Sequence, residues 1–117
     1  MIRSYKDLLV WQRSMNLVEK VYLLTVQLPS SEQFGLVSQM RRAAVSIPSN
    51  IAERYGRQAT GEYRHHVSIA RGSLLELETQ VILCNRLKYL KSADSDSLGN
   101  EIAEISRMLA TLVSRLV

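Results

Sequence analysis

The sequence predicts an all-α protein, specifically an antiparallel up-down-up-down four-helix bundle. Apolar residues recur three or four positions apart along four stretches of the chain, which is the spacing of an amphipathic helix. The 117 residues include only two prolines and five glycines, which leaves short connections between helices. No stretch shows the alternation of a half-buried strand. Four helices with short connections favour antiparallel neighbours, in one domain that covers residues 1–117.

The first predicted helix covers about residues 7–28 and ends before Pro29. Asp7 is a suitable N-cap, because its carboxylate can accept hydrogen bonds from the first free backbone N–H groups. The segment carries more than one line of apolar residues. The stripe expected to face the core consists of Leu8, Trp11, Met15, Val18 and Tyr22.

The second predicted helix covers about residues 31–55 and ends near Gly56. Ser30 and Gln33 have the spacing of a capping box at its start. Pro48 lies inside the segment, where it removes one helix hydrogen bond and crowds the preceding turn. The apolar spacing keeps its phase across this proline, which favours one kinked, continuous helix over the alternative of two helices meeting there. The expected stripe is Leu36, Met40, Ala43 or Ala44, Ile47, Ile51 and Tyr55.

The third and fourth predicted helices cover about residues 60–90 and 95–116. Thr60 is a suitable cap for the third helix, and residues 92–96 are expected to form a turn and a new cap before the fourth. The third stripe is Tyr63, Val67, Ala70, Leu74, Leu77, Val81 and Cys84. The fourth stripe is Leu98, Ile102, Ile105, Leu109, Leu112 and Leu116.

Apolar residues outside these stripes exceed what a lone four-helix bundle needs. They favour a second buried surface, most simply a contact between copies of the chain. The alternative is a wide core inside a monomer. The residues concerned are Val10, Leu17, Val21, Leu24, Leu28, Ile69, Leu83, Met108 and Val113.

Polar residues form a seam beside the apolar stripe of the second helix. We expect an ion pair between Arg42 and Glu76 of the third helix, because an arginine fork satisfies a carboxylate well at a half-buried site. We also expect hydrogen bonds nearby that fix the register of the two helices, the alternative being a ligand or catalytic pocket. The predicted polar seam consists of Gln39, Arg42, Ser46, Asn50, Glu53, Ser73 and Glu76, and His66 belongs to the polar stripe of the third helix.

Basic residues gather at one end of the predicted bundle. The net charge is +4 and the pI is about 9.5, which permits nucleic-acid binding without requiring it. The start of the first helix, the connection between the second and third, and the end of the fourth would meet at this end. The alternative is ordinary solubility, with arginines complementing the C-terminal end of the second helix. The candidate nucleic-acid-binding residues are Arg54, Arg57, Arg64 and Arg71.

Residue patterns for catalysis or metal binding are missing from the sequence. Cys84 is the one cysteine and lies on an apolar stripe, which is typical of a small buried side chain. His65 and His66 are adjacent, so they point about 100° apart on a helix and make a poor metal pair. We therefore expect no enzyme activity, no cofactor and no metal. With no signal peptide and no apolar run that could span a bilayer, a cytoplasmic protein without membrane contact is expected.

Five segments of the chain resemble a known family. They are Asp7-Leu8, Val10-Trp11-Gln12, Gln39 to Glu53, Ile69 to Leu74 and Glu76-Leu77. The sequence is similar to the small bacterial four-helix bundle proteins encoded in intervening sequences of large-subunit ribosomal RNA genes, often labelled S23 ribosomal protein-like. One departure is Arg54, where the family commonly has glycine.

The resemblance implies a bundle that assembles as a ring, commonly a homopentamer. The family is also similar to the accessory protein of diversity-generating retroelements, a basic pentamer that binds nucleic acid and a reverse transcriptase. We therefore expect a non-enzymatic, ring-forming protein that binds RNA or DNA through its basic end. The alternative is a protein-interaction scaffold whose partner is another protein, such as a polymerase-like one, without direct nucleic-acid binding.

Overall fold

The computed structural model describes residues 3–56 and 60–114. These residues form four α-helices and no strand: α1 (Leu9–Thr25), α2 (Ser38–Gly56), α3 (Thr60–Arg86) and α4 (Ser92–Ser114). Short turns precede the first two, namely η1 (Tyr5–Asp7), η2 (Ser30–Glu32) and η3 (Gln33–Val37). The prediction of an all-α fold with four helices is confirmed.

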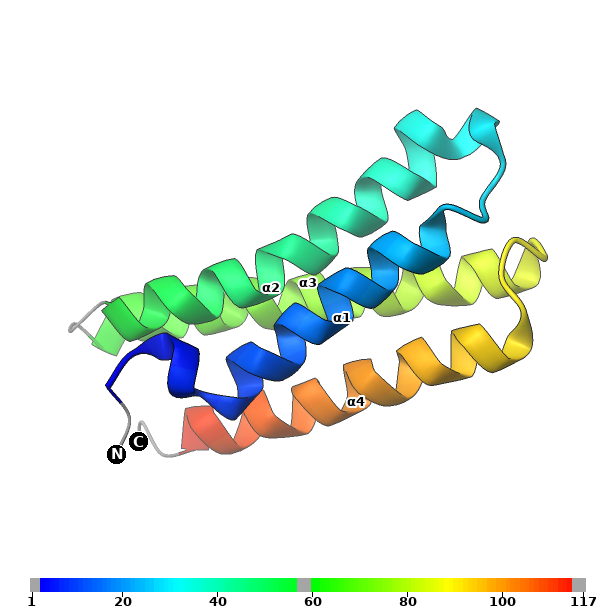
Figure 1. The fold of residues 1–117 in the computed structure, drawn as a ribbon. Helices are drawn as coiled ribbons and strands as arrows, with labels where there is room; N and C mark the ends of the chain where they lie inside the picture. Colours follow the sequence, from blue (N-terminus) through cyan, green and yellow to red (C-terminus); the bar gives the residue numbers. More distant parts are fainter. Residues whose placement is uncertain (1–2, 57–59, 115–117) are drawn as a thin grey trace.

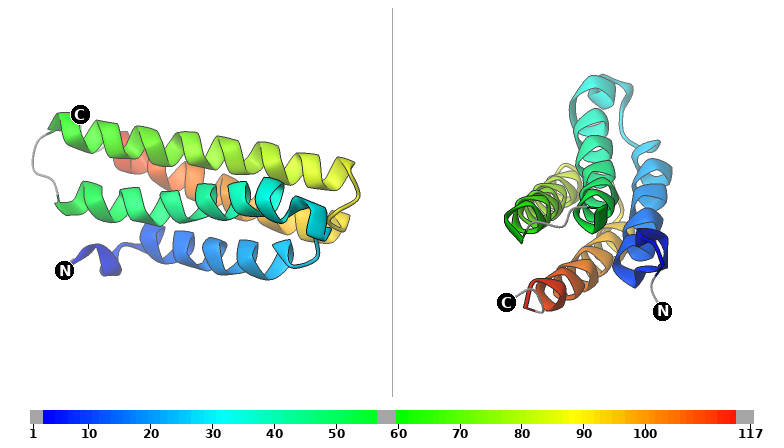
Figure 2. Two further views of the ribbon diagram at one scale, coloured as in Figure 1. Left: turned by 90° about the horizontal axis from the view of Figure 1, so that it is seen from above. Right: turned by 90° about the vertical axis from the view of Figure 1, so that its left-hand side faces the viewer.

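Each helix packs against two neighbours. α1 contacts α2 and α4, and α3 contacts α2 and α4. Seen along the helices, α1, α2, α3 and α4 follow one another around a shared core (Figure 2, right). The start of α1, the end of α2, the start of α3 and the end of α4 lie at one end of the molecule (Figure 1). We call this the basic end, and the α1–α2 and α3–α4 connections lie at the other end.

The buried stripes of α2, α3 and α4 agree with the helical spacing of the sequence. In α2 the buried residues include Met40, Ala43, Ala44, Ile47 and Ile51, and Pro48 lies inside one continuous helix. The described residues of the expected α3 stripe, from Val67 to Cys84, are all buried. In α4, Leu98, Ile102, Ile105 and Leu109 are buried.

The face of α1 that enters the core differs from the predicted one. Val10, Leu17 and Val21 are buried, whereas Met15 and Tyr22 are exposed. Two polar residues, Ser14 and Thr25, complete the buried face. Each hydroxyl donates a 2.7 Å hydrogen bond to the carbonyl four residues earlier, so neither enters the core with an unsatisfied polar group. The prediction was wrong because these satisfied hydroxyls interrupt the apolar pattern of the true core face.

The cap predicted before α1 is also different. Ser4, not Asp7, caps the turn η1, and the two residues form a capping box. The carboxylate of Asp7 accepts hydrogen bonds from the backbone N–H groups of Arg3 (2.8 Å) and Ser4 (3.2 Å). Leu8 precedes α1 without a side-chain cap. Asp7 therefore completes the capping box of the turn ahead of the helix and does not cap the helix itself.

The chain enters α2 through the turns η2 and η3 instead of the predicted capping box of Ser30 and Gln33. A side-chain oxygen of Glu32 lies 3.3 Å from the backbone N–H of Leu36 and accepts its hydrogen bond. The other carboxylate oxygen accepts a 3.3 Å hydrogen bond from the Tyr89 hydroxyl, just beyond the end of α3. Glu32 thus joins the start of the second helical segment to the end of the third.

Candidate nucleic-acid interface and polar seam

Four polar side chains form a continuous chain of hydrogen bonds between α2 and α3. We call Ser46, Asn50, His66 and Ser73 the seam cluster. The Ser73 hydroxyl donates to the Ser46 hydroxyl at 2.9 Å. The Asn50 amide donates to the carbonyl (2.8 Å) and hydroxyl (3.1 Å) oxygens of Ser46. The Nδ1 atom of His66 lies 3.0 Å from the Asn50 side-chain oxygen.

The geometry of the seam cluster fixes the tautomer of His66. Asn50 uses its NH₂ group on Ser46, so its oxygen faces the imidazole and accepts. His66 must therefore carry a proton on Nδ1. A carboxylate oxygen of Glu53 lies 3.5 Å from the same nitrogen, which favours that protonated position.

The seam cluster sets the register of α2 against α3. Moving four residues forward on α2, from Ser46 to Asn50, corresponds to moving seven residues back on α3, from Ser73 to His66. The two helices therefore run in opposite directions here. His66 and Ser73 are buried, so their hydrogen bonds are expensive to break without replacement. This arrangement supports the expectation that the seam fixes register.

Other members of the predicted seam are not joined to it. Among the described residues, Arg42 and Glu76 make no ion pair, so that prediction was wrong. Both side chains are exposed, where water competes with the pairing. Glu76 instead lies 3.4 Å from the amide of Gln80, one turn further along α3. Gln39 is exposed, and Glu53 reaches the seam only through His66.

Two of the four candidate nucleic-acid-binding arginines lie on an exposed side of α3. Arg64 and Arg71 are both exposed and are seven residues apart. Seven residues make almost two helical turns, so the two side chains lie on the same side, about 10 Å apart along the axis. Arg3 and Lys6 are also exposed; Lys6 lies in the turn η1 that precedes α1, and Arg3 lies just before this turn. Arg3, Lys6 and Arg64 are exposed cations of the basic end, and Arg71 lies further along α3, toward its middle.

Arg54 does not belong to that exposed surface. Its side chain is only 8% exposed, because it follows Ile47 and Ile51 at the spacing of the core face of α2. The prediction placed Tyr55 at this core position, and the structure leaves Tyr55 partly exposed instead. Arg57, the fourth candidate, lies outside the described residues.

Two structural features were not predicted from the sequence. The Arg41 guanidinium stacks on the Tyr22 ring, with Cζ 4.5 Å from the ring centroid, and its Nε donates to the Thr25 hydroxyl at 3.0 Å. This contact ties α1 to α2. Phe34, the one phenylalanine of the chain, is 89% exposed in the turn before α2. Its isolation from any stripe was the signal available in the sequence.

Cys84 is a buried thiol of low reactivity. Burial, with a smaller contribution from the charge of Glu32, raises the pKa of its thiol from 9.0 to about 11. Its sulfur lies 3.6 Å from the Met40 sulfur. The thiol is therefore protonated at neutral pH and is a poor nucleophile. Within the part of the chain that the structure describes, no three metal-binding side chains come together, and no helix has the length and apolarity to cross a membrane.

Four packed α-helices without a strand in the described residues define an all-α protein of the helical-bundle kind. The chain belongs to the family of 23S rRNA-intervening sequence proteins, whose family model matches residues 6–111. No curated protein sequence matches the chain.

One solved structure shares the fold over almost its whole length. It is a protein of unknown function from the S23 ribosomal protein family of Bacteroides thetaiotaomicron, solved by crystallography. The two proteins are 24% identical, with a TM-score of 0.81, and the match covers 90% of this chain and 95% of the other. At that identity the likeness supports the fold alone.

Proposed function

We propose that this chain is the subunit of a non-enzymatic, cytoplasmic ring, a homopentamer of up-down-up-down bundles, that binds RNA or DNA through its basic end. The observation that carries the proposal is the pair Arg64 and Arg71, exposed on one side of α3 and without an ion pair to any described residue. Arg3 and Lys6 add charge at the same end. Arg57 is kept in the proposal on the strength of the sequence.

The proposed binding mode is contact with phosphates rather than reading of bases. Arginine recognises phosphate well, whereas single-strand readers also need exposed aromatic platforms. The chain has only 6% aromatic residues. In a ring of parallel subunits every basic end would lie on the same side, so several weak patches would act together.

Assembly is supported by large apolar side chains left on the surface. Leu23, Val26, Phe34 and Leu75 are all highly exposed in the single chain. Contact between copies would remove such side chains from water. These side chains equally favour the second candidate, a scaffold that captures a polymerase-like protein.

The test compares RNA binding by two variants that change the charge equally. Arg64→Glu/Arg71→Glu reverses the charges of the two exposed arginines on α3. Arg86→Glu/Lys91→Glu, the control, makes the same change at the opposite end, where both residues are also exposed. Binding to a short structured RNA is measured by fluorescence anisotropy at 50 and about 200 mM salt, because phosphate contacts weaken steeply with salt.

We expect wild-type binding to fall steeply with salt, and the Arg64→Glu/Arg71→Glu variant to lose at least about tenfold in affinity together with part of the salt slope. The control variant should lose much less. Equal losses of RNA affinity in both variants would show that the net charge of the protein, and not the position of the arginines, controls binding. Salt-insensitive capture of a protein, with no RNA binding, would favour the scaffold.

A further inference from the structure

Phe34 is an exposed apolar knob on the α1–α2 side of the molecule. It shares a shallow surface groove with the exposed side chains of Tyr22, Val45 and Arg42. Covering a phenylalanine side chain removes a large apolar surface from water, so the exposure of Phe34 in the single chain disfavours that state. A partner that covers it would stabilise the complex.

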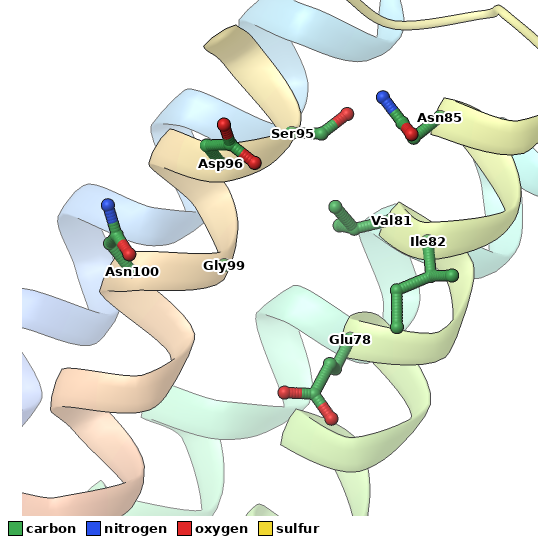
Figure 3. Close-up of a pocket in the computed structure, with 8 residues that line it drawn as sticks. All are labelled: Glu78, Val81, Ile82, Asn85, Ser95, Asp96, Gly99 and Asn100. Atoms are coloured by element: carbon green, nitrogen blue, oxygen red, sulfur yellow. The ribbon is translucent and has the colours of Figure 1, made fainter. Parts of the chain in front are cut away.

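A groove of about 510 Å³ lies between α3 and α4. Val81 and Ile82 form its apolar wall, and Gly99 on α4 adds no side chain to the opposite wall (Figure 3). A methyl group placed on Gly99 would meet nothing within 4 Å. The acidic side chains of Glu78 and Asp96 stand at its edges. The space is large enough for an aromatic ring.

The knob and the groove lie on opposite faces near the same end. Along the helices, α1 and α2 form one side and α3 and α4 the other (Figure 2, right). Glu32, two residues before Phe34, accepts a hydrogen bond from Tyr89, and Met40, six residues after it, contacts Cys84. Phe34 is therefore level with the last turns of α3, which also form the groove.

The charges beside the knob complement those beside the groove. Arg42 is exposed and makes no ion pair with a described residue. Glu78 and Asp96 are likewise exposed and unpaired among the described residues. The Ser95 hydroxyl is buried without a hydrogen-bond partner and is directed across the groove toward Asn85.

We propose that Phe34 of one copy inserts into the α3–α4 groove of the next copy, with Arg42 beside Glu78 and Asp96. The contact joins two different faces, so it is heterologous and leaves a free knob and a free groove at the ends of any open chain of subunits. A rotation about an axis parallel to the bundle keeps the knob and groove level, and such a chain closes into a ring where the rotations at successive contacts add up to a full turn. This inference rests on the assembly part of the proposed function.

The test removes the knob in one variant and the groove in another, and then mixes the two variants. Phe34→Asp removes the knob and keeps the groove. Ile82→Asp places a charge in the groove and keeps the knob, and Gly99→Leu fills the groove without a charge. The structure has room for these changes at Phe34, at Ile82, which is 50% exposed, and at Gly99, so the variants should keep the fold. Circular dichroism checks that each variant is helical. Solution mass is measured by light scattering for each variant and for equimolar mixtures.

We expect each variant alone to be monomeric, at 13.3 kDa, while the wild type is several times heavier. Mixing Phe34→Asp with Ile82→Asp, or with Gly99→Leu, should give a species of twice the subunit mass and no larger, since one intact contact is restored. Leu83→Asp, next in sequence, 43% exposed and turned about 100° around α3, should assemble like the wild type.

Rings formed by both variants, or a mixture that stays monomeric, would overturn the proposed contact. A monomeric wild type would overturn it as well, together with the assembly part of the proposed function. RNA binding is read separately, on the wild type and its Arg64→Glu/Arg71→Glu variant, so its outcome judges the proposed RNA-binding surface and not the contact.

Discussion

Ser73 on α3 donates a 2.9 Å hydrogen bond to Ser46 on α2, and Asn50 donates to the same hydroxyl oxygen from one turn away. The Ser46 oxygen therefore receives two donors at the interface of the two helices. A shift of α2 along α3 by one turn would separate Ser73 from Ser46 and His66 from Asn50 at once. The apolar residues around them would tolerate such a shift better, so the seam cluster is what defines the register.

Replacement of Ser46 by alanine removes only one oxygen atom, but it should clearly lower the free energy of unfolding. Ser46→Ala leaves the buried Ser73 hydroxyl without its acceptor, which costs about 1–3 kcal/mol. The double variant Ser46→Ala/Ser73→Ala removes both groups, so its loss should be smaller than the sum of the single losses. Urea unfolding measures each free energy, with the exposed Ser49→Ala as control. Additive losses would mean that the hydrogen bond contributes nothing.

Replacement of Arg41 tests the tie between α1 and α2. Arg41→Lys keeps the positive charge, but it loses the planar group that stacks on Tyr22 and the Nε donor to Thr25. We expect a loss of about 0.5–2 kcal/mol in unfolding free energy. Arg42→Lys, the next residue and exposed, should change it by less than about 0.5 kcal/mol. Equal effects would contradict a specific role for Arg41.

The α1 face shows why part of the fold escaped sequence analysis. The spacing of apolar residues was enough for α3, whose buried face from Val67 to Cys84 is apolar apart from residues at its edge. In α1 two apolar lines compete, and the buried one contains Ser14 and Thr25. Their hydroxyl groups are satisfied by hydrogen bonds to the preceding turn, so both residues can be buried in the core. The sequence alone does not show which hydroxyl groups are satisfied in this way.

The sequence predicted the polar seam of the candidate site better than it predicted the positions of the long charged side chains. Residue type and helical spacing found Ser46, Asn50 and Ser73, because short polar side chains beside an apolar stripe have few partners other than each other. The ion pair of Arg42 and Glu76 failed, because long side chains at the edge of a seam reach water instead. The burial of Arg54 depends on how far α2 continues its core face.

Replacement of Lys88 by glycine should stabilise the protein. Lys88 has a φ of 64°, in the left-handed region that disfavours residues with a Cβ, at the turn that ends α3. Lys88→Gly should relieve about 0.5–1 kcal/mol and raise the melting temperature. Leu87→Gly, one residue earlier and without a positive φ, should instead lower it. A drop for both variants would show that the turn is not strained at Lys88.

Alkaline pH should destabilise the wild type through Cys84. The pKa of the thiol is raised to about 11 in the fold and is near 9.0 in the unfolded chain, so the folded state holds the proton more tightly. This contribution to stability is complete below pH 9 and is lost as pH rises through 11. The slope between these values is at most about 1.4 kcal/mol per pH unit.

The variant Cys84→Ala separates this effect from other groups that titrate in the same range. Burial and the nearby charge of Glu32 also raise the pKa of Tyr89, so the wild type carries both effects and the variant only that of Tyr89. Cys84→Ala should be less stable at pH 8, because it leaves a small cavity next to Met40. The gap in urea midpoint between the two proteins should then narrow from pH 9 to 11. A gap that stays constant would show that the thiol ionises as easily in the fold as in the unfolded chain.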